Sequence, residues 1–140
     1  MKAQVSLELL ITIGVVLAFT VPVVLLLFTT SQIGYESASV SQANAAAKTL
    51  ADNINEIALQ GEGARKIMLV SFPSSMTDFT VEANEVVVKM KTTSGDYHAI
   101  SPIFVNAKVN PASFTGKAGL LRVRMTTTKE TDGRIGVEID

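Results

Sequence analysis

The hydrophobic pattern divides the chain into one long uncharged stretch and a remainder made of shorter, alternating stretches. No charged residue occurs over residues 9–28. A helix of about 20 residues is about 30 Å long, which matches the hydrocarbon core of a bilayer. We therefore predict a hydrophobic helix over residues 4–28 that either spans a membrane or packs in the core of a helical polymer.

Beyond this stretch the pattern narrows to one apolar stripe. Residues 29–63 begin with a polar neck rich in Ser and Thr. Apolar residues then recur within this range at spacings of three and four, which indicates one face of a helix. The stripe consists of Val40, Ala43, Ala47, Leu50, Ala51, Ile54, Ile57 and Ala58. Gly61 and Gly63 are typical of a helix end. We predict one helix over residues 5–60, with Leu50, Ile54 and Ile57 packed on the rest of the chain.

Residues 64–140 change to a period of two, which predicts a β-rich head. Four segments alternate between apolar and polar residues, at 78–82, 86–91, 121–126 and 135–140. Residues 66–72 are more continuously apolar, as expected for a central strand. These segments are separated by turn residues. The turns are Ala83-Asn84, Ser94-Gly95-Asp96, the stretch 116–119 and the hairpin signal Asp132-Gly133. Pro102 and Pro111 suit an edge or loop between the fourth and fifth strands.

The predicted fold class is therefore α+β. A long N-terminal helix packs through the stripe of its upper half on an antiparallel sheet of about six strands that has one apolar face. A head of roughly 80 residues has little core of its own, so we expect the helix to contribute to its stability.

Two interpretations of residues 4–28 compete, a signal anchor that tethers an external domain and a helix that packs against copies of itself. An ordinary secretory signal has an apolar region of about 7–15 residues followed by a cleavage site. Here the apolar region is longer, and no small-x-small site closes it. Any cleavage is therefore expected within residues 1–3, and Lys2 supplies a positive charge for the cytoplasmic side.

The first residues are similar to a known family. Lys2-Ala3-Gln4-x-Ser6-x-Glu8-Leu9, followed by an apolar helix, resembles the class III signal peptide of archaeal type IV pilins. Residues 51–63, followed by a strand that ends at Pro73, resemble the helix-to-head junction of the same proteins. The resemblance implies that a prepilin peptidase removes residues 1–3 by cutting between Ala3 and Gln4. The chain departs from the family in its leader of three residues and in Ala3, where Gly is common in archaeal flagellins.

The resemblance implies a structural subunit of a surface filament used for adhesion. Its partners would be copies of itself, the prepilin peptidase, an assembly ATPase and a membrane platform. The precursor would lie in the membrane and the filament outside the cell. Two alternatives stay open, namely a membrane-anchored extracellular binding module that does not polymerise, and a minor pilin or pseudopilin.

Glu8 and Pro22 are the candidate residues for assembly and bending. After cleavage the Gln4 amine would lie four residues from Glu8, and in a core of packed helices the carboxylate needs such a partner, which we expect from the adjacent subunit. The alternative is that Glu8 stays at the headgroup level near the positive helix N-terminus. Pro22 removes one helical hydrogen bond, so we expect a mild kink or a soft joint, with Thr20 helping the freed carbonyl.

Composition fits one small domain plus a helix. The chain has 140 residues and a formal net charge of −1, which gives no sign of an obligatory nucleic-acid partner. Residues 4–64 contain five acids and one base, whereas residues 65–140 contain ten bases and eight acids. The two parts therefore carry net charges of −4 and +2. This asymmetry indicates either two solvated faces or an attraction between neighbouring subunits, and surface pairs contribute only about 0–1 kcal/mol each.

Candidate catalytic chemistry is sparse. The sequence has no Cys, which excludes disulfides and thiolate metal sites. His98 is the only histidine and stands next to Tyr97 in an expected turn, so we interpret it as exposed. Gly61-Glu62-Gly63 lacks the Lys-Ser/Thr of a phosphate loop, and Thr126-Thr127-Thr128 is interpreted as strand rather than as a site for O-linked sugar. We expect no enzyme activity, no cofactor and no metal.

Overall fold

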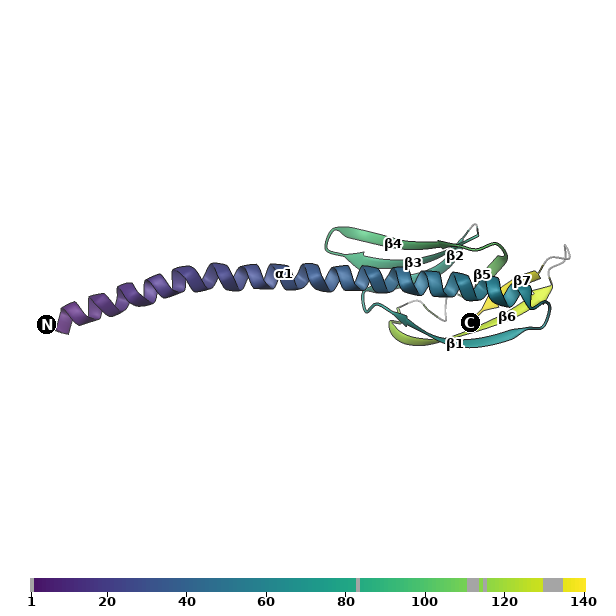
Figure 1. Cartoon of the computed structure of the whole chain (residues 1–140), viewed down its shortest axis with the longest axis horizontal. Coiled ribbons are helices and arrows are strands. Elements are labelled where there is room, and N and C mark those ends of the chain that lie inside the picture. Colours follow the sequence, from purple (N-terminus) through teal and green to yellow (C-terminus); the bar gives the residue numbers. More distant parts are fainter. Residues whose placement is uncertain (1, 83, 111–113, 115, 130–134) are drawn as a thin grey trace. The chain divides into compact units, whose positions relative to one another are not determined.

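The computed structural model describes residues 2–82, 84–110, 114, 116–129 and 135–140, with side chains from Ser6 onward (Figure 1). This part contains the helix α1 (Lys2–Leu59) and the strands β1 (Arg65–Phe72), β2 (Met76–Glu82), β3 (Glu85–Thr92), β4 (Gly95–Pro102), β5 (Asn106–Val109), β6 (Gly119–Lys129) and β7 (Ile135–Ile139). The chain divides into two compact units, residues 1–35 and residues 36–140. We call the second the head unit.

The helix ends where the glycines predicted it would. Leu59 is the last residue of α1, and the Gln60 and Gly61 amides donate to the Ile57 and Ala58 carbonyls in a closing turn. Gly61 and Gly63 both have positive φ, at 91° and 84°, a conformation that side chains with a Cβ rarely adopt. The chain then reverses and enters β1.

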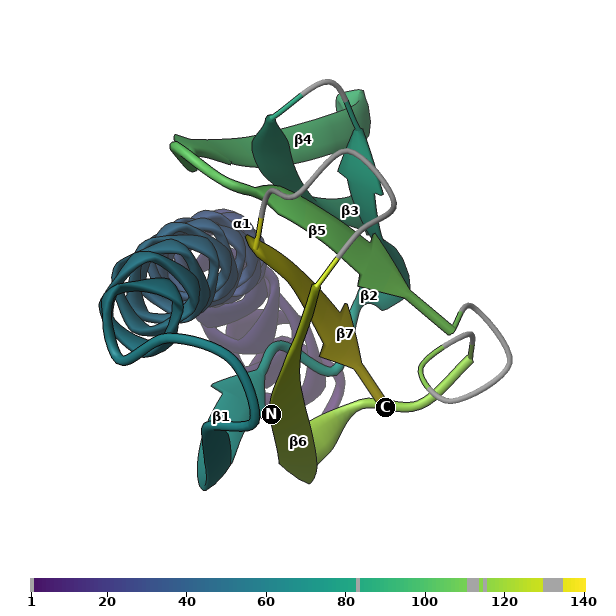
Figure 2. The ribbon, with the colours of Figure 1, turned by 90° about the vertical axis from the view of Figure 1, so that its right-hand side faces the viewer.

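The head unit contains two sheets. β2, β3 and β4 form an antiparallel sheet of order β2-β3-β4, and the other four strands form a sheet of order β1-β6-β7-β5. β1 and β7 both pair with β6 in antiparallel fashion, whereas β5 pairs with β7 in parallel. β2 and β5 lie next to each other, so the two sheets together form a curved wall beside α1 (Figure 2). The predicted α+β fold with antiparallel strands on the helix is confirmed, with a break between β2 and β5 and one parallel pair.

The core fills the space between this wall and the upper half of α1. The buried apolar residues of the helix are Ala43, Ala46, Ala47, Leu50, Ala51, Ile54, Ile57 and Ala58. Five of these eight are alanines, whose small side chains allow the strands to approach the helix closely. Phe79 contacts Phe72 in a tilted arrangement and Phe114 edge to face, with ring centroids 6.0 and 5.2 Å away, and these rings lie in the core.

The structure corrects two strand predictions. Residues 66–72 were expected to be a central strand, but β1 is the edge strand of its sheet. β4 and β5 were not located by the periodicity, because β4 keeps few apolar residues on either face and β5 has only four residues. Pro102 ends β4 at a sheet edge, as expected. Ala83, Pro111, Asp132 and Gly133 lie outside the described residues, although β6 and β7 do pair as the expected hairpin requires.

Candidate functional site

The apolar half of α1 forms a cylinder that no described part of the chain covers. Every large apolar side chain over residues 7–28 is exposed. Within the described residues, α1 is one helix long and apolar enough to cross a membrane. A helix that is apolar on all sides is normally buried in lipid or in protein. The helix is therefore compatible with membrane anchoring.

Threonines in and just beyond this stretch already have hydrogen-bond partners inside the helix. The hydroxyls of Thr12, Thr20, Thr29 and Thr30 each donate to the backbone carbonyl four residues earlier, at 2.8–3.0 Å. Such back-bonding satisfies a hydroxyl where no water is present. These polar residues therefore do not oppose burial of the helix in an apolar environment.

Pro22 lies inside α1, as the sequence predicted. Because proline has no N–H, the carbonyl of Ala18 loses its helical partner. The hydroxyl of Thr20 donates to the carbonyl of Val16 at 2.8 Å, so it does not serve Ala18. The expectation that Thr20 compensates for Pro22 is therefore wrong, because the Thr20 side chain reaches back one full turn from its own position.

Glu8 is exposed on the first turns of the apolar cylinder, and the described residues offer its carboxylate no partner. Its backbone carbonyl accepts the hydrogen bond from Thr12. Ala3 and Gln4 lie in α1, and the structure describes their backbone alone. In a helix, positions 4 and 8 are neighbours on one face. Gln4 and the only charge of the apolar half therefore lie on adjacent turns.

The small residues of the apolar cylinder form a feature that the periodicity analysis missed. Gly14, Ala18 and Pro22 follow one another at intervals of four and therefore share one face of α1. A Cβ built on Gly14 would meet nothing within 4 Å. Small residues at this spacing allow a second helix to approach closely in an apolar environment. The motif small-x-x-x-small in the sequence is the signal that would have found them.

Leu50, Ile54 and Ile57 are fully buried in the core of the head unit. They recur at intervals of four and three on the face of α1 that the two sheets cover. Side chains also join the helix to both sheets, because Lys66 pairs with Glu56 at 2.6 Å and Asn44 bonds the Tyr97 hydroxyl at 3.1 Å. The upper helix is thus an integral part of the head.

Thr127 on β6 fixes the junction between α1 and β1. Its buried hydroxyl donates to the Gly61 carbonyl at 2.6 Å and accepts from the Ala64 amide at 2.8 Å. Its backbone also bonds the Gly63 amide and the Ala64 carbonyl. One residue therefore bonds four backbone groups of the turn that follows the helix, from Gly61, Gly63 and Ala64.

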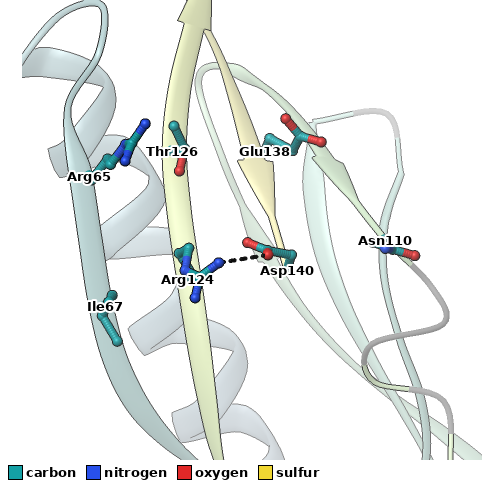
Figure 3. A pocket seen from close by; sticks show the side chains of 7 residues that line it. All are labelled: Arg65, Ile67, Asn110, Arg124, Thr126, Glu138 and Asp140. Carbon is teal, nitrogen blue, oxygen red and sulfur yellow. Dashed lines mark hydrogen bonds and ion pairs between the residues drawn. The ribbon is translucent and has the colours of Figure 1, made fainter.

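The outer face of β1, β6 and β7 carries an open hollow of about 600 Å³ (Figure 3). It is lined by Arg65, Ile67, Asn110, Arg124, Thr126, Glu138 and Asp140. Arg124 and Asp140 form an ion pair of 3.3 Å, marked by the dashed line in Figure 3. Both side chains stay about half exposed, and such pairs are weak.

The remaining candidates for chemistry stay apart. His98 is exposed, as expected, although it lies in β4 rather than in a turn. No group of three or more possible metal ligands occurs among the described residues. Comparison of the chain with known proteins gives no match to a family model, to a curated protein or to a solved structure.

Proposed function

We propose that this chain is the structural subunit of an archaeal type IV pilus-like surface filament used for adhesion, polymerising through its N-terminal helix. The observation that carries the proposal is the uncovered apolar cylinder over residues 7–28. In water this surface must be covered, either by lipid in the precursor or by the same helix of other subunits. A change from the first to the second environment is what assembly of such a filament requires.

The face formed by Gly14, Ala18 and Pro22 supports helix–helix packing. Between apolar helices the attraction comes mainly from close van der Waals contact, which small residues permit. The hydroxyls that bond back into the helix remove the cost of burying them. At Pro22 the lost hydrogen bond would make the packed helix easier to bend.

Glu8 would set the register of the subunits. Removal of residues 1–3 by the prepilin peptidase creates a free amine on Gln4, and the carboxylate of Glu8 would pair with the Gln4 amine of the adjacent subunit. Breaking a buried ion pair by removing one partner costs about 3–5 kcal/mol, because the other charge stays behind without a partner. An assembly ATPase and a membrane platform would extract the subunits from the membrane.

The test is filament yield from cells that express Glu8→Ala. We expect this variant to reach the membrane and to be cleaved normally, but to form few or no filaments in electron micrographs. Asp96→Ala is the matched control, since Asp96 is an exposed acid on β4 of the head unit. Normal filament yield from Glu8→Ala, or a cyclised Gln4 in native filaments, would contradict the pairing.

The same preparations separate the proposal from a non-polymerising membrane-anchored module. An anchored module would stay in the membrane fraction with residues 1–3 in place, and no filaments would be seen. A minor pilin or pseudopilin would be found in filaments at a small fraction of the major subunit, which quantitative mass spectrometry of purified filaments measures.

A further inference from the structure

Two large apolar side chains are exposed at the end of the head unit where α1 stops. Leu59, the last residue of α1, is 88% exposed, and Phe104, between β4 and β5, is 84% exposed. Both line a hollow of about 440 Å³ together with Val105 and Ile135, which are half-buried. We call Leu59, Phe104, Val105 and Ile135 the tip patch. Leu59 and Phe104 are more exposed than any large apolar residue described on the lower half of α1.

The backbone holds Phe104 in this position. The Phe104 amide donates to the side-chain oxygen of Asn55 on α1 at 2.9 Å. The preceding residue, Ile103, is buried, and its amide donates to the Asn84 carbonyl at 2.7 Å. Asn84 itself has a φ of 68°, which is uncommon for a residue other than glycine. Hydrogen bonds to α1 and to the turn between β2 and β3 thus hold the segment that displays Phe104.

A second apolar surface lies on the outer face of β1 and β6. Ile67, Leu69 and Leu120 are 59%, 62% and 65% exposed, and Arg122 lies opposite Leu69 across the strand pair. We call these four residues the β1–β6 patch. Continuous apolar sequence in a strand is typical of strands covered on both faces. In this chain the inner face of β1 packs on the core, whereas nothing in the described residues covers Ile67 and Leu69.

The β1–β6 patch extends from near the end of α1, where Lys66 beside Ile67 pairs with Glu56, towards the middle of the helix. Ser71 is opposite Leu120 in the sheet, and its hydroxyl accepts a hydrogen bond of 2.7 Å from Gln42 on α1. Gln42 precedes Leu59 by 17 residues, which corresponds to about 26 Å along a helix. The Leu120 end of the β1–β6 patch therefore lies well away from the tip patch, and both patches are exposed within one chain. Two copies displaced along the helix axis bring them together.

The charges around the patches are complementary. Glu62 follows Leu59 by three residues, and Glu85 follows Asn84, which lines the same hollow. Both carboxylates are exposed and have no partner among the described residues, and Lys129 is an exposed base opposite Ile135 in the sheet. Arg122 likewise has no ion pair in the described part, and neither β1 nor β6 contains an acid. Complementary charge orients two surfaces and disfavours wrong pairings.

We propose that the tip patch of one copy of this chain docks on the β1–β6 patch of the next copy. This contact rests on the proposed function and adds to it a second interface, between heads, beside the contact between the apolar helices. Because the two patches are different surfaces, the contact is heterologous and leaves one of each free at the ends. Repetition with an axial displacement gives an open helical assembly rather than a closed dimer.

Cross-linking with introduced cysteines tests the contact, and the chain has no cysteine of its own. The full-length chain with Leu59→Cys and Leu69→Cys is expressed in cells, and filaments are treated with a short bifunctional maleimide. We expect a ladder of covalent multimers from the double variant and none from either single variant. The control pair is Leu59→Cys with Ile100→Cys, since Ile100 is exposed to a similar degree on β4 of the other sheet.

Each outcome of the cross-linking experiment supports or contradicts the contact between heads. Filaments without a ladder would overturn the head contact and leave the proposed function standing. Cross-linked dimers from a single variant would show a symmetric contact and overturn it as well. If the unsubstituted chain forms no filaments at all, both proposals fail.

A charge variant keeps the test decisive if the cysteines themselves disturb assembly. Arg122→Glu places an acid against the acids near the tip patch, so we expect filament yield to fall roughly tenfold or more. Lys91→Glu, an exposed base on β3, is the matched control and should assemble normally. Equal yields from the two variants would overturn the contact.

Discussion

Glu36 on α1 accepts two hydrogen bonds from Thr93, one from the backbone amide at 2.9 Å and one from the side-chain hydroxyl. Thr93 lies in the turn between β3 and β4, so this contact ties the far end of a hairpin to the first turn of the head unit. Hydrogen bonds to a carboxylate favour its charged form. The Thr93 hydroxyl is the main reason why the pKa of Glu36 is lowered from its ordinary value.

The lowered pKa of Glu36 determines how the stability of the fold changes with pH. Because the pKa of Glu36 is lower in the folded state, its contribution to stability is fully present above the unfolded pKa of about 4.3 and is lost as the pH falls through the folded value. We predict that Thr93→Val returns the pKa of Glu36 towards its ordinary value. NMR titration of the Glu36 carboxyl carbon in both proteins measures the change. An unchanged titration curve would show that Thr93 does not hold the carboxylate in solution.

Leu50 should contribute strongly to the stability of the head. A fragment that begins at Ser31 contains the whole head unit, and we expect it to be soluble, monomeric and β-rich. In this fragment Leu50→Ala should lower the free energy of unfolding by about 2–5 kcal/mol, because it leaves a cavity in the core. Leu59→Ala on the same helix is the control and should change it by less than about 0.5 kcal/mol. Urea denaturation followed by circular dichroism measures both values.

Thr127→Val tests the junction after the helix. Valine has nearly the same shape but no hydroxyl, so the Ala64 amide and the Gly61 carbonyl would each lose a partner. We expect a loss of about 1–3 kcal/mol in the free energy of unfolding. Thr128→Val, at the exposed neighbouring position, should be nearly neutral. Equal effects of the two substitutions would contradict a specific role for the Thr127 hydroxyl.

Processing should leave Gln4 as the first residue. We expect mass spectrometry of the surface protein to show loss of residues 1–3 and a free amine on Gln4. The pairing of this amine with Glu8 requires that it be charged and not cyclised. Retention of the leader on the surface-exposed protein would contradict assignment to the pilins and would favour an anchored module.

Pro22 should control how easily the filament bends. Pro22→Ala restores the N–H that bonds the Ala18 carbonyl, so the helix gains a hydrogen bond at that turn. We expect filaments of this variant to be straighter, with a longer persistence length in electron micrographs. Val23→Ala, at the adjacent position of the same helix, is the control for a change of apolar volume. Filaments of unchanged stiffness would show that Pro22 only kinks the helix.

The sequence alone determined the features that depend on local periodicity. These features are the uncharged stretch, the stripe through Leu50 and Ile54, and the helix end at the glycines after Leu59. Each depends on residues only a few positions apart, through the helical repeat or the φ preference of glycine. The alternating segments likewise predicted strands with one buried face, because the strand repeat is two.

The tertiary structure decided which strands are neighbours. β5 pairs with β7, and β1 lies at the edge of the same sheet. Strand order of this kind depends on residues far apart in the sequence, so no local pattern predicts it. For the same reason the apolar residues of β1 were assigned to a central strand, although Ile67 and Leu69 lie on an uncovered face. The exposure of Phe104 depends on Asn55 of α1 and on Asn84 of the turn between β2 and β3, which bond Phe104 and Ile103. The hydrophobic pattern shows that a residue is apolar, but only packing decides whether its own chain covers it.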